Sequence, residues 1–452
     1  VHGLAHIAAL RLQDGQVTMS NRCIKTQKWK EFMDSGKSKR EWANPHEMSE
    51  SCRAVEGLYE GPNPNVTVWK LGDGKVAALS ESRRGRIIAI DSESLETLET
   101  IDTIKDDAAF LHAAHFYAET TGGESEAGFH CTITCHESQR ETGTHYEFGY
   151  AIYFGGAADS PLECVAELKV TNFSAAEADS QKPESRVSYI HTLGVTSNYV
   201  VLFASDRRLS YTNWLAQRED SSKTFGFYEL WGPTGVPASL HIFKRSEDNK
   251  LEYLGERRLQ RPHMVWHTGN SFEDSNQALV VDVTSMIGRQ RRLCRFTVPM
   301  TPDKRGDTVV EEDLSMDAHE FPCINPHLHG LEHKFTYALS DPYKTSSRIY
   351  KYDHASGKHL SWGDNDLTPS EPVFIPRIAA DGIATGSIDE DDGAVLAIVN
   401  DPADDSSFLV ILDARTFDEI ARVRTPVTVN HGIHSVYMPA PRTELQPKIR
   451  RY

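Results

Sequence analysis

Four widely separated histidines are the residues of this chain best placed to carry chemistry. They are His115, His191, His267 and His434. The first two gaps between them are each 76 residues, and the third is 167, about twice as long. Such spacing is typical of similar positions in successive repeat units. A neutral imidazole nitrogen is a good ligand for several transition metals. If the repeats meet at a common axis, these side chains could share one metal ion.

The elements that must position these histidines are short β-strands. The predicted strands are 4 to 6 residues long, rich in β-forming residues and separated by Gly- and Asp-containing turns; they are residues 7–12, 76–79, 87–90, 199–204, 278–283, 395–399 and 408–412. Helical periodicity is scarce, and the best candidates are residues 29–33, 45–57 and 206–215. The pattern predicts an all-β chain with helical insertions.

A β-propeller is the architecture that best accommodates so many short strands. A plain four-stranded blade takes about 40–50 residues, and insertions could raise that to about 65 residues in each of about seven blades. None of the 7 tryptophans is followed by Asp, so the chain lacks the Trp-Asp dipeptide of one common propeller family.

Composition excludes several other classes of protein. With 48 basic and 65 acidic residues the net charge is −17, which disfavours a nucleic-acid partner. The apolar runs are strand-sized, far below the roughly 20 residues of a membrane span. The 7 cysteines are scattered and odd in number, which favours a reducing compartment. The chain has neither a phosphate-binding glycine loop nor a Gly-x-Ser-x-Gly nucleophile elbow.

The segments around the histidines resemble the motifs of the carotenoid cleavage oxygenases. Residues 266–273, Trp-His-Thr-Gly-Asn-Ser-Phe-Glu, resemble the family's Phe-His-His-x-Asn-Ala-Tyr-Glu motif, and residues 189–199 resemble its x-x-His-Asp-Phe-x-x-Thr-x-Asn-Tyr motif. His115 precedes a Thr-Gly-Gly-Glu turn, and His434 lies in a segment similar to Gly-Phe-His-Gly. Further similar segments occur in the same order along the chain, at residues 91–97, 320–325, 370–374 and 389–393.

This resemblance implies a seven-bladed β-propeller with a helical and loop cap over the iron-bearing face. We expect residues 1–452 to form a single propeller domain with cap insertions. In the family, some tens of residues precede the segment that residues 1–6 resemble. We therefore expect an N-terminal segment, and any targeting signal in it, to be missing from this sequence.

The resemblance also implies a metal site. Fe(II) would be held by His115, His191, His267 and His434. Three carboxylates just outside would accept hydrogen bonds from the ligating imidazoles, and the matching residues are Glu81, Glu320 and Glu371. The neighbouring residues His112, His263 and His431 are expected to be structural.

The implied reaction is oxidative cleavage of an alkene C=C bond by O2, giving two carbonyl products. Carotenoids or apocarotenoids are the expected substrates, because Ser80 occupies the position where the phenol-cleaving branch has Lys, and residues 41–45 lack that branch's Tyr. Pro64 and Thr268 depart from the Thr and His that the family often has.

Alternatives stay open on the sequence alone. The chain could cleave stilbenoids or other aryl alkenes at the same site, act as an isomerase, or be a non-catalytic propeller that binds a partner. A cytoplasmic location is expected. Peripheral membrane contact through residues 209–215 and 225–231 is an even alternative to core packing of those segments. The sequence does not define an oligomeric state.

Overall fold

The computed structural model describes residues 5–35, 64–115, 117–121, 124–156, 162–300, 308–342, 346–377, 389–429 and 432–438, apart from gaps at residues 14, 65, 73, 82–84, 221–222, 224, 316, 318–319, 365 and 433. Strands dominate these residues, and helices are few and short. The predicted all-β class is therefore confirmed, and each of the seven predicted strand segments coincides with an observed strand.

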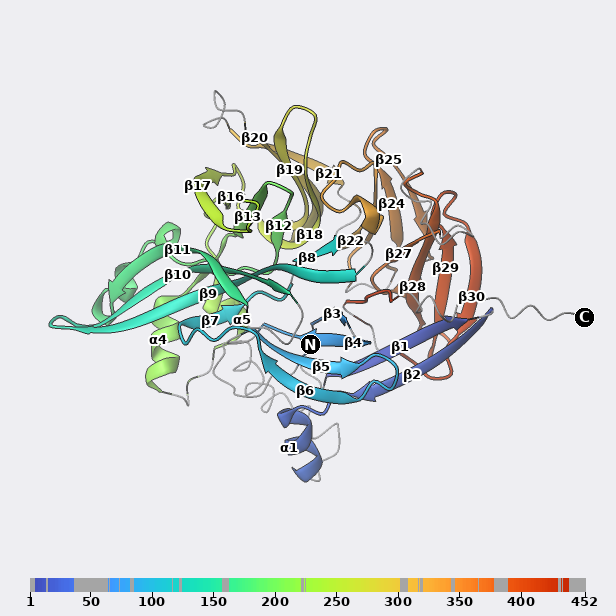
Figure 1. The fold of residues 1–452 in the computed structure, drawn as a ribbon, viewed down its shortest axis with the longest axis horizontal. Coiled ribbons are helices and arrows are strands. Elements are labelled where there is room, and N and C mark those ends of the chain that lie inside the picture. Colours follow the sequence, from blue (N-terminus) through green and yellow to red (C-terminus); the bar gives the residue numbers. More distant parts are fainter. Residues whose placement is uncertain are drawn as a thin grey trace, which may run out of the picture.

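Six sheets of four or five strands follow one another around a common centre in chain order (Figure 1). The first sheet contains β3 (Thr67–Gly72), β4 (Lys75–Leu79), β5 (Arg86–Asp91) and β6 (Thr97–Asp102). The second contains β7 (Ala109–His112), β8 (Tyr117–Thr121), β9 (Glu124–Arg140), β10 (Gly143–Gly156) and β11 (Glu163–Ser174). The third contains β12 (Leu193–Val195), β13 (Tyr199–Ala204), β16 (Ser239–Arg245) and β17 (Leu251–Arg258).

The fourth sheet contains β18 (Met264–Glu273), β19 (Ala278–Ile287), β20 (Gln290–Pro299) and β21 (Val310–Ser315). The fifth contains β22 (Glu320–Cys323), β23 (Phe335–Leu339), β24 (Ile349–Asp353) and β25 (Lys358–Trp362). The sixth contains β26 (Thr368–Pro369), β27 (Val373–Pro376), β28 (Gly393–Asp401), β29 (Ser406–Asp413) and β30 (Glu419–Arg424). All pairings within these sheets are antiparallel, as a propeller requires.

The expected number of seven blades is wrong for the part of the chain that the structure describes, which contains six. Strands β1 (His6–Gln13) and β2 (Gln16–Cys23) form only a two-stranded hairpin. The hairpin packs against the β3–β6 sheet, where Ile7 and Ala9 contact the cluster containing Val76 and Ile88. A blade needs four strands, and no further described strand pairs with this hairpin.

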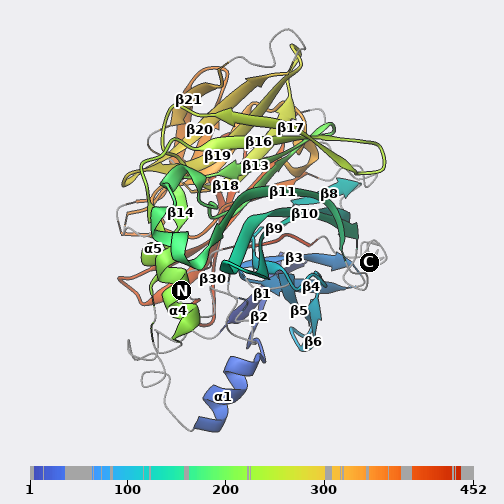
Figure 2. The ribbon, with the colours of Figure 1, turned by 90° about the vertical axis from the view of Figure 1, so that its left-hand side faces the viewer.

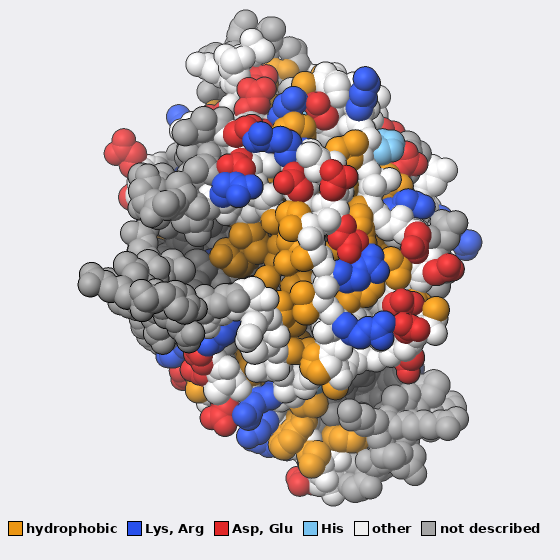
Figure 3. Space-filling model, turned by 90° about the vertical axis from the view of Figure 1, so that its right-hand side faces the viewer, with side chains coloured by type: hydrophobic (Ala, Val, Ile, Leu, Met, Phe, Trp, Pro, Cys, Tyr) orange, Lys and Arg blue, Asp and Glu red, His pale blue; other side chains and the backbone are white. Residues whose placement is uncertain are grey.

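The outer face of the last sheet is apolar and half-buried. Leu396, Ile398, Ile411 and Val423 lie on this face, whereas the alternate residues of the same strands pack into the core. On the side of the molecule where β1, β2 and β30 lie in Figure 1, apolar side chains gather in a hollow in the middle of the surface (Figure 3). The hollow is consistent with a ring that the six described sheets do not close.

Short helices flank the sheets. The α-helices are α1 (Gln27–Ser35), α4 (Tyr211–Glu219) and α5 (Phe227–Leu230), and the 3-10 turns are η2 (Ala175–Ser180), η3 (Pro183–Ser185) and η4 (Pro326–Leu328). Helix α1 stands away from the sheets, whereas α4 and α5 lie along one side (Figure 2). Two of the predicted helical segments thus overlap α1 and α4; the third, residues 45–57, lies outside the described residues.

Segment 209–215, which was a candidate for membrane contact, is largely core. Tyr211, Trp214 and Leu215 of α4 are buried, and the Trp214 ring packs against Phe148 of β10 with ring centroids 5.0 Å apart. In segment 225–231, by contrast, the side chain of Tyr228 is 63% exposed. Among the described residues no helix has the length and apolar character needed to cross a membrane.

One edge strand of each sheet faces the centre of the ring. These inner strands include β7, β12, β18, β22 and β26, each of which ends the strand order of its sheet. Strand β18 contacts both β12 and β22, so inner strands of successive sheets touch. This arrangement brings side chains from distant parts of the chain to one place.

Candidate metal centre

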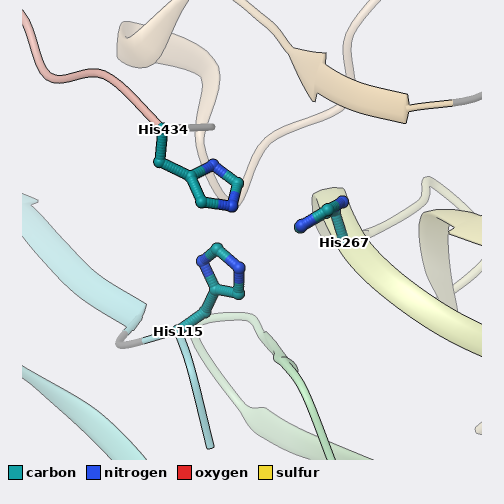
Figure 4. A group of neighbouring side chains, drawn as sticks. All are labelled: His115, His267 and His434. Atoms are coloured by element: carbon teal, nitrogen blue, oxygen red, sulfur yellow. The ribbon is translucent and has the colours of Figure 1, made fainter. Parts of the chain in front are cut away.

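Three of the four predicted ligands converge at the centre of the ring. A ring nitrogen of each of His115, His267 and His434 lies within 4.8 Å of the others. The His115 ring centroid is 5.0 Å from that of His267 and 4.5 Å from that of His434. Figure 4 shows the three imidazoles arriving from different elements and pointing toward one another.

His191 joins the same cluster. Its Nε2 atom is 3.2 Å from Nε2 of His115, and its ring centroid is 5.1 Å from that of His267. The structure thus brings together all four histidines selected from the sequence. Their role as metal ligands stays a prediction at this point.

Irregular backbone near the inner strand ends aims these side chains. His115 follows β7, and its N–H donates to the carbonyl of His191, just before β12, at 3.2 Å. His267 lies in β18 between two shifts of the strand register, one after Val265 and one after Thr268. Such bulges re-aim side chains and are common beside functional sites. His434 follows the last strand, β30.

Carboxylates from distant parts of the chain hold two of the imidazoles. Glu320, the first residue of β22, lies with Oε2 2.7 Å from Nδ1 of His267. Glu371, between β26 and β27, lies with Oε1 3.1 Å from Nδ1 of His434. Glu320 is anchored in turn by Thr284 Oγ1 at 3.1 Å and by an ion pair with Arg291.

The third carboxylate, Glu81, shares His191 with a tyrosine. Nδ1 of His191 is 3.2 Å from Oε1 of Glu81 and 2.9 Å from Oη of Tyr189, and the tyrosine hydroxyl donates to Glu81. Tyr189 was not among the residues predicted to form the site, although it lies two residues before His191 in the 189–199 segment. Side chains two residues apart in an extended segment point to the same side, so this spacing is the signal that could have identified it.

These contacts determine which nitrogen of each ring is available. A carboxylate only accepts hydrogen bonds, so Nδ1 of His191, His267 and His434 carries the proton and Nε2 keeps its lone pair. The Nε2 atoms of His267 and His434 are buried and have no hydrogen-bond partner in the part of the chain that the structure describes. Buried unpaired nitrogen atoms are costly, and a metal ion would satisfy them. The cluster therefore fits a metal ion.

The electrostatics of the cluster favour neutral imidazoles. Burial lowers the pKa of His267 to about 4, although Glu320 acts in the opposite direction. Burial, together with the three neighbouring histidines, holds the pKa of His115 well below its usual value. Burial would raise the pKa of Glu320, but His267 and Arg291 outweigh it, so the pKa of this carboxyl is lowered. Neutral imidazole is the form that binds metals.

The two neighbouring histidines that the structure describes have other partners. Nε2 of His112 lies 2.9 Å from Nδ1 of His130. His263 contacts Ser285 Oγ at 2.8 Å and Glu311 Oε2 at 3.1 Å. Both are held in networks away from the four-histidine cluster, and His431 lies outside the described residues.

A second group of potential ligands, formed by Asp282, His333 and His354, is fully engaged in hydrogen bonds. Arg295 pairs with both oxygens of Asp282, at 2.7 and 2.8 Å. His333 contacts Asn270 at 3.0 Å, and Thr336 bridges His333 and His354. The ligand atoms therefore already have partners, and a guanidinium lies where a cation would bind.

The departures from the family motifs have distinct surroundings. Thr268, which stands where a second histidine is usual, donates from Oγ1 to the carbonyl of Leu193 at 2.8 Å and so links β18 to β12. Phe321, beside Glu320, adopts a left-handed φ of 53°, and its ring centroid lies 5.2 Å from those of both His267 and His434. Residues 41–45 lie outside the described residues.

The fold and the site define a β-propeller protein with a cluster of four histidines at its centre, three of them backed by carboxylates. A sequence profile of the family described as retinal pigment epithelial membrane protein matches residues 1–439. The chain belongs to this family, which confirms the predicted resemblance.

Individual relatives agree with this assignment. Carotenoid cleavage dioxygenase 8 of Arabidopsis thaliana chloroplasts is 24% identical over 97% of this chain and 77% of its own length. Two solved structures are each 18% identical to this chain. Cobalt-substituted Synechocystis apocarotenoid oxygenase has a TM-score of 0.67, and the match covers 96% of this chain and 87% of that chain. Pseudomonas brassicacearum lignostilbene dioxygenase has a TM-score of 0.68, and the match covers 96% of this chain and 86% of that chain. The structural matches support the propeller fold, and the relatives' names confirm the predicted class of enzyme, a dioxygenase.

Proposed function

We propose that this protein is a non-haem Fe(II) dioxygenase that cleaves a C=C bond of a carotenoid or apocarotenoid into two carbonyl products. The observation that carries the proposal is the set of four converging histidines, of which two have a buried Nε2 atom without a hydrogen-bond partner among the described residues. Bound there, Fe(II) would supply the redox chemistry needed for O2 to react with an alkene. Both oxygen atoms of O2 end in the two carbonyl groups, so no other oxidant is needed.

The chain's own residues would hold and orient the ion. His115, His191, His267 and His434 provide four neutral nitrogen ligands, which leave the positive charge of the ion uncompensated. Three carboxylates stand one hydrogen bond further out: the buried Glu320 and the half-buried Glu81 and Glu371. They balance the charge, fix the proton on Nδ1 and hold each ring at its angle.

An aromatic wall beside the cluster suits an apolar polyene. The Trp266 ring packs edge-on against His191 with centroids 5.0 Å apart, and Phe227 and Trp231 surround Tyr189 at 5.0 and 5.7 Å. Ser80 next to Glu81 cannot supply the cation that the phenol-cleaving branch places there. These features favour a polyene over a stilbenoid such as that named for the Pseudomonas relative.

Domain organisation and location follow from the same proposal. Residues 1–452 would form one propeller domain with its cap. An apolar substrate dissolves in membranes, and the exposed Tyr228, with half-buried Phe225 and Phe227 beside it, is the part of segment 225–231 suited to peripheral contact from the cytoplasm. The apolar substrate and O2 are the only partners that the proposal requires.

Product analysis tests this function. Fe(II)-loaded protein would be incubated in air with a mixture of an apocarotenal and resveratrol, and the products identified by mass spectrometry. Polyene aldehydes are the expected products. Hydroxybenzaldehydes instead would establish the aryl-alkene alternative. The His267→Ala variant is the control, and formation of the same products at an equal rate by this variant would overturn the proposal.

A further inference from the structure

Three charged side chains are buried just after β13. Asp206, Arg207 and Arg208 retain only 5%, 6% and 6% of their surface. Charged residues are almost never fully buried unless they are paired. Arg207 and Arg208 belong to the short strand β14 (Arg207–Leu209), which pairs with β15 (Trp231–Pro233).

The pairing among these three groups is incomplete. Nε of Arg207 is 3.8 Å from Oδ1 of Asp206, beyond hydrogen-bond distance, and neither atom has a hydrogen-bond partner among the described residues. Arg208 donates to the carbonyl of Arg186 at 3.1 Å. Burial raises the pKa of Asp206 to about 6, although both arginines act in the opposite direction. The Arg207 guanidinium is therefore buried beside a carboxyl that does not hydrogen-bond to its Nε, whereas Arg208 is held by a backbone carbonyl.

The backbone places Arg207 next to Tyr189, the residue whose hydroxyl contacts His191. Tyr189 N–H donates to the carbonyl of Arg207 at 2.9 Å. Beside this bond, Ser188 and Arg208 form an isolated antiparallel β-bridge. Residues opposite each other in an antiparallel pair project on the same face, with Cβ atoms about 5 Å apart. Arg207 is therefore the cross-strand neighbour of Tyr189, whose hydroxyl touches both Glu81 and His191.

Aromatic rings continue from this pair to the surface. Tyr189 packs against Phe227, and the Arg207 guanidinium lies over the ring of Tyr228, 5.4 Å from its centroid. Tyr228 is 63% exposed. From the surface toward His191, the exposed ring of Tyr228 is thus followed by the buried guanidinium of Arg207 and then by the aromatic wall. This order suits an apolar molecule whose outer end carries a negative charge.

We propose that Arg207 anchors the carboxylate of the substrate, so that the preferred substrate is a polyene acid rather than a hydrocarbon carotenoid. The inference rests on the proposed function and specifies its substrate class. A planar guanidinium binds a carboxylate through two parallel hydrogen bonds, and such charge-assisted bonds are strong where water is excluded. The unpaired Nε of Arg207 provides one donor of that fork.

Binding under anaerobic conditions tests the anchor without turnover. Fe(II)-loaded protein would be titrated with retinoic acid and with retinol, a matched acid and alcohol, and binding followed by quenching of tryptophan fluorescence. We expect the acid to bind about 10- to 100-fold more tightly than the alcohol. Arg207→Gln should remove this preference and change retinol binding by less than about threefold. Arg207→Lys should keep part of it.

Two further variants separate an anchor from a merely structural arginine. Asp206→Asn removes the carboxyl that competes for Arg207 and should strengthen acid binding severalfold, whereas a purely structural pair would give weaker binding. Arg258→Gln, on β17 with its side chain 75% exposed, is the matched control and should change nothing.

The outcomes distinguish this inference from the proposed function. Equal affinity of the parent for acid and alcohol, or an unchanged preference in Arg207→Gln, would overturn the anchor, and cleavage of neutral polyenes in air would still support the dioxygenase. Conversely, Arg207-dependent acid binding without cleavage of any alkene would leave the anchor and remove the dioxygenase.

Discussion

Two clusters of potential metal ligands in this molecule both rely on histidines but have opposite properties. The central cluster brings together His115, His267 and His434, and the second brings together Asp282, His333 and His354, each with its ligand atoms within 4.8 Å. In the first, the carboxylates contact Nδ1 and leave Nε2 bare. In the second, Arg295 and Thr336 occupy the ligand atoms.

The difference teaches that proximity of ligand types does not define a metal site. What matters is whether a lone pair is left without a partner in a place from which water is excluded. The central cluster meets that condition, and the second cluster is a structural network that joins β18, β19 and β23 to their neighbours.

The largest expected effect is the loss of metal from the central cluster. His267→Ala should lower the iron content of purified protein at least about tenfold and abolish alkene cleavage, because it removes one ligand and the imidazole that Glu320 holds in place. Metal analysis by mass spectrometry measures this. His333→Ala is the matched control, and a similar loss of iron in that variant would erase the distinction between the clusters.

The second cluster should respond in stability instead. Asp282→Asn removes a fully buried charge that pairs with the half-buried guanidinium of Arg295 and should lower the free energy of unfolding by about 3–5 kcal/mol. Asp313→Asn, whose side chain is 26% exposed beside Arg292, should cost less. Urea unfolding provides the comparison. Equal losses for the two variants would show that burial of the Asp282 pair has no special weight.

Acid should weaken the folded state through the second cluster. Burial lowers the pKa of His333 to about 4, against 6.5 in the unfolded chain. The unfolded state therefore takes up a proton first as the pH falls, and this group's contribution to stability is lost between about pH 6.5 and pH 4, at a cost of roughly 1–3 kcal/mol. The free energy of unfolding, plotted against pH across this range, should have a shallower slope for His333→Gln than for the parent. Parallel slopes would contradict the assignment.

Smaller changes should tune the central cluster without destroying it. Glu320→Gln keeps the shape of the side chain but removes its charge and should weaken metal affinity about 10- to 100-fold. A competition titration with a chelating dye measures this affinity. Glu311→Gln, which changes the carboxylate partner of His263, is the control. An unchanged affinity in Glu320→Gln would mean that the carboxylate does not act on the metal.

The smallest effect is expected from the tyrosine hydroxyl. Tyr189→Phe retains the ring among Phe227 and Trp231 and removes only the contacts with Glu81 and His191. Because Glu81 still reaches Nδ1 of His191, metal affinity should fall less than about tenfold. The visible spectrum of the Co(II)-substituted variant would report any change of ligand geometry. A loss as large as that of His267→Ala would make Tyr189 indispensable.

Much of the central cluster was predictable because its residues stand in short, recognisable segments. His191 and His267 lie within long motifs, and Glu320 and Glu371 follow in the expected order. The role of Tyr189 was not predicted, since a tyrosine two residues before a ligand is as often a core residue. The predicted number of blades was wrong, because the spacing of residues indicates repeats but does not show whether each repeat forms a complete four-stranded blade.

The sequence by itself determined the strand-rich class, the family and the histidines worth testing, since these depend on local periodicity and on motifs of a few adjacent residues. Only the tertiary structure decided which nitrogen atoms stay bare and which charges stay buried. Those properties depend on partners far apart in the chain, such as Glu320, 53 residues from His267, and Glu81, 110 residues from His191. They also depend on exclusion from water, which exists only after the sheets have packed.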